Sequence, residues 1–231
     1  MENCSPTRTH LLFDLDGTII NSFQGITNCV CYALACLGII VENKNDLLPF
    51  IGPPLTYSFK EYYHLNNEQM TLAVAKYRER YAEKGIYENE LYPDIDYLLQ
   101  QLTNHGYTLY IATSKPQIFA EQILEYLHVD KYFTYIGGSD MDGKLQSKAD
   151  VINDVLSKNG ISAQQVWMIG DRKYDVEGAH AVQVPSVGVL YGFGNRKELQ
   201  ACACDVIVKD VNDLKNFFCK KDLSVKNKDV V

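Results

Sequence analysis

His10-Leu11-Leu12-Phe13-Asp14-Leu15-Asp16-Gly17-Thr18 is the most informative segment of this 231-residue chain. Three large apolar residues run without a break into Asp14, which is typical of a short strand buried on both faces of a parallel sheet. Ligands bind open parallel sheets at the carboxyl ends of their strands, so we expect Asp14 and Asp16 at such an edge. Gly17 relaxes the backbone in the turn that follows.

Asp14 and Asp16 also indicate a chemistry. Two adjacent carboxylates repel one another unless a cation or a proton lies between them, and Mg²⁺ prefers one or two carboxylates together with phosphate oxygens. One carboxylate can then attack phosphorus while the other moves a proton. A plain solvated turn after a strand would explain the same residues equally well, because Asp and Gly are ordinary turn residues. The rest of the chain favours the chemical interpretation.

Composition limits the possible partners. A hydrophobic content of 46% and a charged content of 22% are typical of a globular protein. The net charge of -7 and the pI near 5.2 argue against binding to nucleic acid polymers or to anionic membranes. An acidic protein can still bind a small phosphorylated metabolite locally. No apolar run approaches the length of a membrane span, so we expect a cytoplasmic protein.

The seven cysteines are odd in number and include no Cys-x-x-Cys pair. A chain of this size does not need disulfides, so we expect reduced thiols. Cys29 with Cys31, and Cys202 with Cys204, are weak metal signals because no histidine or further cysteine stands at ligand spacing. We interpret them as small buried apolar residues.

The chain changes its periodicity twice. From Asn21 to Leu91 it has helical spacing and no convincing strand, with helices expected over 26–38, 55–63 and 67–84. Strands and helices then alternate, with strands expected over 107–112, 133–136, 166–169, 186–190 and 205–208, and helices over 95–106, 117–127, 148–158, 176–182 and 197–203.

This alternation predicts an α/β fold with a doubly wound, Rossmann-like parallel sheet. Residues 1–20 and 92–231 would form the core, and residues 21–91 an inserted α-helical cap over the site. The polar tail after Cys219 is expected to fray.

Three further stretches follow predicted strands or open helices. Thr113 and Ser114 close a strand, and a hydroxyl with free backbone N–H groups suits a phosphate. Ser114 would serve equally well as the N-cap of the following helix. Lys148 opens a helix, where a lysine is usually a solvated surface charge.

The stretch from Val166 to Asp175 is the strongest second signal. A buried strand ends at Gly170 and Asp171, with Asp175 four residues later. Asp171 can complete a metal site, and Asp175 can orient Lys148 or hold a metal-bound water.

In this order the stretches resemble the four motifs of the haloacid dehalogenase superfamily. Asp14-Leu15-Asp16-Gly17-Thr18 matches the first motif, Thr113 the second, Lys148 the third, and Gly170-Asp171 with Asp175 the fourth. The resemblance covers nearly the whole chain.

That resemblance implies a role for each residue. Asp14 is the nucleophile that forms an aspartyl-phosphate, and Asp16 is the general acid and base. Thr113 and Lys148 hold the phosphoryl group, and Mg²⁺ lies between Asp14, the Asp16 backbone carbonyl and Asp171. Enzymes catalyse in-line phosphoryl transfer mostly by positioning and electrostatic stabilisation, and a cation and a lysine facing a carboxylate nucleophile supply both.

The place of the insertion resembles the helical cap of the phosphoglycolate-phosphatase-like branch. Within that branch the stretches 51–55, 112–116 and 188–194 look closest to bacterial 5'-nucleotidases. One departure is Asn21-Ser22, where the branch often has Asp-Ser.

We therefore expect a Mg²⁺-dependent phosphomonoesterase acting on a nucleoside 5'-monophosphate, with phosphoglycolate as the second choice. A sugar-phosphate phosphatase, a phosphomutase and an inactive scaffold with this fold remain open. Asp16 argues against a dehalogenase, which has no alkoxide leaving group to protonate. A phosphonatase would need a cap lysine that forms a Schiff base, and the sequence context singles out none of the lysines in residues 21–91. The chain would be a monomer or a homodimer.

Several other residues have an ordinary structural explanation. The tyrosines of the predicted cap could stack on a base, but aromatic residues at helical spacing more often pack helices together. Arg78 and Arg80 are interpreted as a solvated face, and His180 as a structural histidine. Lys115 stands beside Thr113, close enough to touch a substrate, and is not predicted to be catalytic.

Overall fold

The computed structural model describes residues 8–140, 145 and 147–219. Its centre is a six-stranded sheet in the order β5-β4-β1-β6-β7-β8, and all neighbouring strands are parallel. The strands are β1 (His10–Phe13), β4 (Thr108–Pro116), β5 (Phe133–Ser139), β6 (Val166–Gly170), β7 (Ser186–Val189) and β8 (Val206–Val208). The predicted parallel α/β sheet is confirmed.

Strand β1 lies in the middle of the sheet, between β4 and β6. Leu11 and Phe13 belong to one hydrophobic cluster and Leu12 to another, and all three side chains are fully buried. Alternate residues of a strand point to opposite faces, so the two clusters lie on the two sides of the sheet. The unbroken apolar run is therefore the result of burial on both faces.

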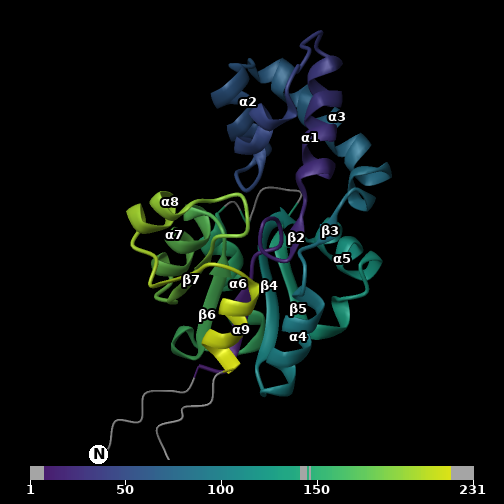
Figure 1. Ribbon diagram of the computed structural model, residues 1–231. Coiled ribbons are helices and arrows are strands. Elements are labelled where there is room, and N and C mark those ends of the chain that lie inside the picture. The colour runs from purple at the N-terminus through teal and green to yellow at the C-terminus, as the bar shows by residue number, and fades with distance from the viewer. Residues whose placement is uncertain (1–7, 141–144, 146, 220–231) are drawn as a thin grey trace, which may run out of the picture.

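Helices cover both faces of this sheet (Figure 1). Val151 and Val155 of α6 (Lys148–Asn159) and Ala179 of α7 (Lys173–Ala181) join the cluster of Leu12. The opposite cluster includes buried side chains from α4 (Ile95–Asn104), α5 (Gln117–Tyr126) and α9 (Val211–Cys219). Outside residues 21–91 the described chain also forms η3 (Asp130–Tyr132), η4 (Ala163–Gln165) and α8 (Arg196–Ala201).

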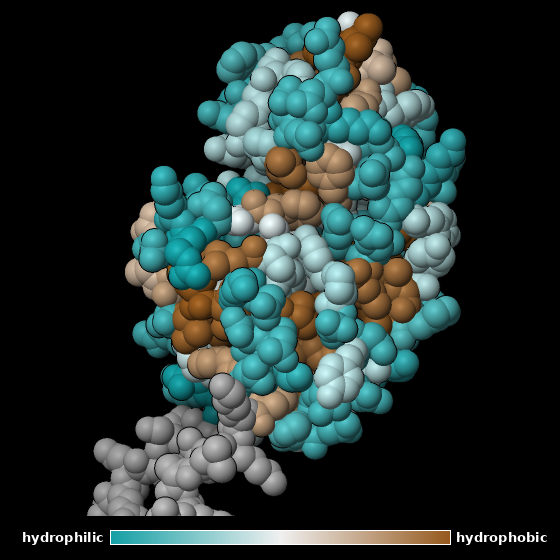
Figure 2. Space-filling view, viewed as in Figure 1, coloured by the Kyte–Doolittle hydropathy of each residue, from teal (hydrophilic) through white to brown (hydrophobic). Residues whose placement is uncertain are grey.

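Residues 21–91, which lie between β1 and α4 in the chain, form a separate group of helices, here called the helical segment. Figure 1 shows them at the top, beyond the ends of the strands. On the face drawn in Figure 2, hydrophobic residues gather where this group meets the sheet-bearing part. Its elements are α1 (Phe23–Ala35), η1 (Lys44–Phe50), α2 (Leu55–Tyr63), α3 (Asn67–Glu83) and η2 (Gly85–Tyr87).

Two short strands stand where the chain enters and leaves this segment. β2 (Ile20–Asn21) and β3 (Glu90–Leu91) pair antiparallel, with Ile20 opposite Leu91. The expectation of no strand between Asn21 and Leu91 was wrong at these two ends. A two-residue strand has no periodicity of its own, and only its distant partner creates it.

Three other features differ from the expectation. The 3-10 helix η1 was not predicted, and β4 continues past Ala112 to Pro116. Helix α9 was not predicted. It packs Phe217 and Phe218 against Trp167, with ring centroids 5.6 and 6.4 Å from the indole. The tail after Cys219 lies outside the described residues.

Across the described part of the chain, none of the helices has both the length and the apolar character that crossing a membrane requires.

Candidate active site

The four predicted stretches meet at one edge of the sheet. Asp14 follows β1, Thr113 lies near the end of β4, Asp171 follows β6, and Lys148 is the first residue of α6. Strands β1, β4 and β6 are direct neighbours, so their carboxyl ends bring these side chains together. All four residues are buried.

Lys148 lies at the centre of this group. Its ammonium Nζ is 2.8 Å from Asp14 Oδ1 and 2.8 Å from Asp175 Oδ1, and it donates to the Ala112 carbonyl at 3.1 Å. Burial works against the positive charge, but the carboxylates of Asp14 and Asp175 raise the pKa of Lys148 above its ordinary value. The ammonium therefore stays charged, and Lys148 is not the solvated surface lysine that its position in the sequence would suggest.

The start of α6 fixes the backbone of Lys148. The Ser147 hydroxyl accepts from the Asp150 N–H at 3.1 Å, and Asp150 Oδ2 accepts from the Ser147 N–H at 3.0 Å. This reciprocal capping box satisfies two backbone donors at the helix N-terminus. Lys148 therefore leaves the helix from a defined first position.

Three carboxylates surround the same point. Oxygens of Asp14, Asp171 and Asp175 all lie within 4.8 Å of one another. Burial and the neighbouring carboxylates raise the pKa of Asp171, and burial raises that of Asp175 to about 6 despite the contact with Lys148. With Lys148 the ionised cluster carries two excess negative charges, and hard oxygen ligands of this kind suit a divalent cation such as Mg²⁺.

The loop after β7 holds Asp171 in place. Its Oδ2 accepts from the backbone N–H of Phe193 at 2.7 Å and of Gly194 at 3.3 Å. A Cβ at Gly17, whose φ is +84°, would overlap the Asp171 carboxylate, and one at Gly194 would overlap the Asp171 carbonyl. A Cβ at Gly170 would overlap the Asp175 carboxylate. These glycines are required because the backbone passes directly against the carboxylates.

The acidic cluster predicts a pH-dependent effect of Mg²⁺ on stability. Because folding raises the pKa of Asp171 and Asp175, the metal-free protein loses stability as pH rises from the ordinary carboxyl range through about 6. A cation needs the ionised carboxylates and relieves their repulsion. At a hundred times its dissociation constant, we expect Mg²⁺ to raise the free energy of unfolding by about 2.7 kcal/mol at pH 7.5.

At pH 5 the same Mg²⁺ concentration should stabilise the protein less. Urea denaturation with and without Mg²⁺ at both pH values measures the difference, and Na⁺ at equal ionic strength is the control. An equal effect of Mg²⁺ at both pH values would contradict the metal site.

Asp16 faces a second buried lysine. Lys115 Nζ lies 3.0 Å from Asp16 Oδ2 and donates to the Tyr81 hydroxyl at 2.7 Å. Against the effect of burial, Asp16 and Tyr81 raise the pKa of the Lys115 ammonium. Lys115 was only weakly marked in the sequence, because its contact with Tyr81 of α3 joins residues far apart in the chain. Two buried lysines thus serve the two carboxylates of the first motif.

Thr113 and Ser114 lie beside these groups. Thr113 is fully buried, and its hydroxyl accepts from the Lys115 N–H at 3.3 Å. Ser114 lines the cavity in front of the carboxylates. The expectation that Ser114 caps the next helix was wrong: β4 runs through it, and the N-cap of α5 is Pro116, without a side-chain cap.

A cavity of about 520 Å³ lies between the sheet edge and the helical segment. Asp14, Asp16, Thr113 and Lys115 line one side of it. The helical segment contributes mainly apolar and aromatic residues, with one basic residue: Phe50, Pro53, Pro54, Leu55, Tyr57, Val74, Tyr77, Arg78 and Tyr81. This size is typical of pockets that bury a whole small molecule.

The two arginines of α3 differ. Arg80 makes a bidentate pair with Glu88, at 2.7 and 2.9 Å, and has a structural role. Arg78 lines the cavity, and no hydrogen bond or ion pair joins it to any residue the structure describes. The expectation of a solvated face was therefore wrong for Arg80, whose side chain is 18% exposed, whereas Arg78 is half-exposed and its guanidinium can bind a group of a ligand in the cavity.

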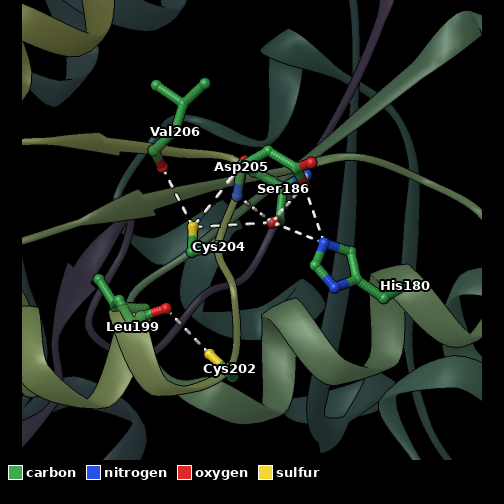
Figure 3. A network of polar contacts seen from close by, with 7 residues as sticks. All are labelled: His180, Ser186, Leu199, Cys202, Cys204, Asp205 and Val206. Atoms are coloured by element: carbon green, nitrogen blue, oxygen red, sulfur yellow. Dashed lines mark hydrogen bonds and ion pairs between the residues drawn. The ribbon is translucent and has the colours of Figure 1, made fainter.

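His180, Ser186 and Asp205 form a separate polar network near the start of β7 (Figure 3). His180 Nε2 lies 2.8 Å from Asp205 Oδ2 and 3.2 Å from Ser186 Oγ. A catalytic triad needs one ring nitrogen for the serine and the other for the carboxylate, whereas here one nitrogen faces both. The contacts agree with the structural role predicted for His180.

The cysteine thiols also have structural surroundings. In Figure 3, Cys204 and Cys202 donate to the carbonyls of Val206 and Leu199, at 3.1 and 3.3 Å. All six cysteines that the structure describes carry free thiols, as expected. Cys29 is buried, whereas Cys31, Cys202 and Cys204 are only half-buried, so the expectation of burial was wrong for these three.

Comparison with known proteins finds relatives that cover most of this chain. A family model described as haloacid dehalogenase-like hydrolase matches residues 11–189. A 5'-nucleotidase of Pseudomonas aeruginosa is 43% identical over 192 residues, which cover 83% of this chain and 87% of that protein. A phosphoglycolate phosphatase of Escherichia coli O157:H7 is 31% identical, covering 87% of this chain and 89% of that protein.

Solved structures also match this chain. A predicted phosphatase from Clostridium acetobutylicum superposes with a TM-score of 0.89 and 44% identity, covering 91% of this chain and 98% of that chain. Both the sheet and the helical segment fall within such coverage.

Proposed function

Because the chain belongs to the haloacid dehalogenase-like hydrolase family and is a phosphatase within it, we propose that it hydrolyses nucleoside 5'-monophosphates with the help of Mg²⁺. The observation that carries this proposal is the placement of Asp14 and Asp16, each paired with a buried lysine, on one side of a cavity with an aromatic opposite wall.

The first half of the reaction transfers the phosphoryl group to Asp14. A carboxylate oxygen of Asp14 attacks phosphorus, and the bond to the ester oxygen breaks. Asp16 donates a proton to the leaving oxygen, which departs as the nucleoside hydroxyl. The Lys148 ammonium and the Thr113 hydroxyl hold the phosphoryl oxygens, and Lys148 also keeps Asp14 in place.

The second half regenerates the enzyme. Asp16 takes a proton from water, whose oxygen attacks phosphorus and breaks the bond to Asp14. Inorganic phosphate leaves, Asp14 is free again, and Asp16 carries the proton needed for the next leaving group. Asp16 therefore loses one proton in the first half and regains one in the second, so its protonation state is restored after each turnover.

The residues present fit a bound Mg²⁺. Asp14 and Asp171 would hold it together with the Asp16 backbone carbonyl, and the loop N–H groups of Phe193 and Gly194 would orient Asp171. When bound, Mg²⁺ neutralises the phosphoryl charge that Asp14 must approach. Asp175 would support the site through Lys148 and the Arg172 N–H, to which it is 3.0 Å away.

The cavity favours a nucleotide over phosphoglycolate. A volume of about 520 Å³ exceeds what a two-carbon acid fills, and Tyr57, which is 49% exposed, presents aromatic surface on the same cavity wall as Arg78. Aromatic rings bind a planar base by stacking, and a guanidinium binds carbonyl oxygens on its edge. The relative named 5'-nucleotidase supports the same choice.

Phosphate release from a panel tests the proposal. The panel contains nucleoside 5'-monophosphates, phosphoglycolate and sugar phosphates, each with Mg²⁺ and with excess chelator. We expect the highest kcat/KM for the nucleotides and no turnover with chelator. A preference for phosphoglycolate would replace the substrate proposed here, and full activity in chelator would remove Mg²⁺ from the mechanism.

Arg78 gives a more specific prediction. Arg78→Ala should raise KM for nucleoside monophosphates by about 10-fold, which is the loss of roughly 1.4 kcal/mol of binding, with little change in kcat. Lys76→Ala on the same helix is the control, because Lys76 pairs with Glu79 at 2.7 Å and is not part of the cavity wall. An unchanged KM would show that Arg78 does not contact the substrate.

A further inference from the structure

Lys115 occupies a position that the phosphoryl-transfer scheme leaves without a role. Its side chain is buried, 5% exposed, and bridges two parts of the molecule. Nζ lies 3.0 Å from Asp16 Oδ2 on the sheet side and 2.7 Å from the Tyr81 hydroxyl on the helical segment. It also lies over the Tyr81 ring, 4.6 Å from the centroid. Lys148 holds Asp14 in the same way that Lys115 holds Asp16.

The two carboxylate oxygens of Asp16 have different surroundings. Oδ2 is bound by Lys115. Oδ1 is buried and has no hydrogen-bond partner among the described residues. A buried carboxylate oxygen without a partner is costly in a resting protein, and it is the atom left to meet a substrate or a water. Holding Oδ2 therefore fixes where Oδ1 points.

Tyr81 in turn restrains Lys115. Its ring stacks on Tyr77 at 5.4 Å with an interplanar angle of 11°, and it contacts Phe119 at 5.4 Å. The tyrosine is 1% exposed. A ring packed on two sides has little freedom, so its hydroxyl is a fixed acceptor for the lysine.

We infer that Lys115, anchored by the Tyr81 hydroxyl, is a positioning residue that directs Asp16 Oδ1 at the reacting oxygen in both halves of the reaction. The inference rests on the proposed aspartyl-phosphate mechanism. In the first half Oδ1 passes its proton to the ester oxygen as the P–O bond breaks. In the second half it receives a proton from the water that attacks the aspartyl-phosphate.

A chromogenic ester separates the two halves. The p-nitrophenolate of p-nitrophenyl phosphate is a good leaving group that needs little protonation, so the first half depends only weakly on Asp16. The second half needs Asp16 to activate water whatever the substrate was. Misplacing Asp16 should therefore slow dephosphorylation far more than phosphorylation with this ester.

The decisive variant is Lys115→Met, measured by stopped flow. We expect a burst of about one p-nitrophenolate per active site, followed by a steady rate roughly 10- to 100-fold below that of the unaltered protein. KM should fall together with kcat, because the phosphoenzyme accumulates. With adenosine 5'-monophosphate, which has a poor leaving group, kcat/KM should fall by a larger factor than with the chromogenic ester.

Two milder variants distinguish a loss of positioning from misfolding of Lys115→Met. Tyr81→Phe keeps the stacked ring and removes only the hydroxyl, so it should show the same pattern with a smaller decrease. Lys115→Arg should recover part of the rate. Circular dichroism checks that each variant is folded. The control is Lys76→Met, because Lys76 lies on the same helix as Tyr81 but outside the cavity wall. This control should behave like the unaltered protein.

The opposite results are equally clear. A higher KM with unchanged kcat and no burst would make Lys115 a substrate-binding residue and overturn the inference. Normal kinetics in a folded Lys115→Met would do the same. If the unaltered protein hydrolysed neither p-nitrophenyl phosphate nor adenosine 5'-monophosphate, or if Asp14→Asn hydrolysed them as fast, the proposed function itself would be wrong.

Discussion

Asp14→Asn is expected to abolish phosphate release, with a decrease in kcat of at least roughly 10³-fold, the scale seen when a covalent nucleophile is removed. The amide is nearly the same size and can still accept a hydrogen bond from Lys148, but it cannot form the aspartyl-phosphate. The side chain is buried, 5% exposed, so water does not substitute for it easily. Phosphate release with a nucleoside monophosphate and Mg²⁺ measures the effect.

The variant should remain folded. Asp14 contributes to the repulsion that raises the pKa of Asp171 and Asp175, so removing its charge should not lower the stability of the metal-free protein. Asp46→Asn, at an exposed position of the helical segment, is the matched control and should keep full activity. Near-normal turnover by a folded Asp14→Asn would refute the assignment of the nucleophile.

Lys148→Met is expected to affect both activity and stability. The substitution leaves Asp14 and Asp175 facing each other without the ammonium that is now 2.8 Å from each. Removing one partner of a buried ion pair typically costs about 3 kcal/mol or more of unfolding free energy. Activity should fall by roughly 10³-fold because the phosphoryl charge loses a fixed cation.

Urea denaturation at pH 7.5 without Mg²⁺ measures the loss of stability. Part of it should return at pH 5, where the carboxylates that the lysine balanced take up protons more readily. Lys158→Met on the same helix is the control, because its side chain is 51% exposed and its pair with Asp154 contributes little. Equal stability of the two variants would mean that Lys148 does not balance the cluster.

The central sheet could be predicted because its evidence is local. Leu11, Leu12 and Phe13 form a continuous apolar run, and such a run leads to burial on both faces wherever the strand lies. The carboxyl end of a parallel strand is also a defined place, so Asp14 and Asp171 could be put at one edge before their distance was known. The protein's strand order then made β1 and β6 neighbours.

The roles of Lys115 and Lys148 could not be predicted from neighbouring residues in the sequence. Nothing around Lys115 in the sequence distinguishes it from a surface lysine, because its partner Tyr81 lies on α3 and the fold alone brings the two together. Lys148 was identified only by its place in an ordered set of motifs. Arg78 and Arg80 are two residues apart and have different roles, since one meets Glu88 and the other lines the cavity.

Helix α9 was missed for a related reason. It is nine residues long, and isolated helices of that length are marginal in water. Its stability comes from tertiary contacts such as Phe218 against Tyr107 and Trp167. A pattern that depends on a distant aromatic partner is not visible in a window of nine residues.

The antiparallel pairing of Ile20 with Leu91 has an evolutionary consequence. The helical segment begins and ends at this one pair of strands, so an insert of another length or sequence can be exchanged there without changing the register of β1 on β4. Such exchange alters the walls of the cavity while Asp14, Lys148 and Asp171 keep their spacing. Substrate preference can therefore evolve through changes in the helical segment while the residues that carry out the reaction stay the same.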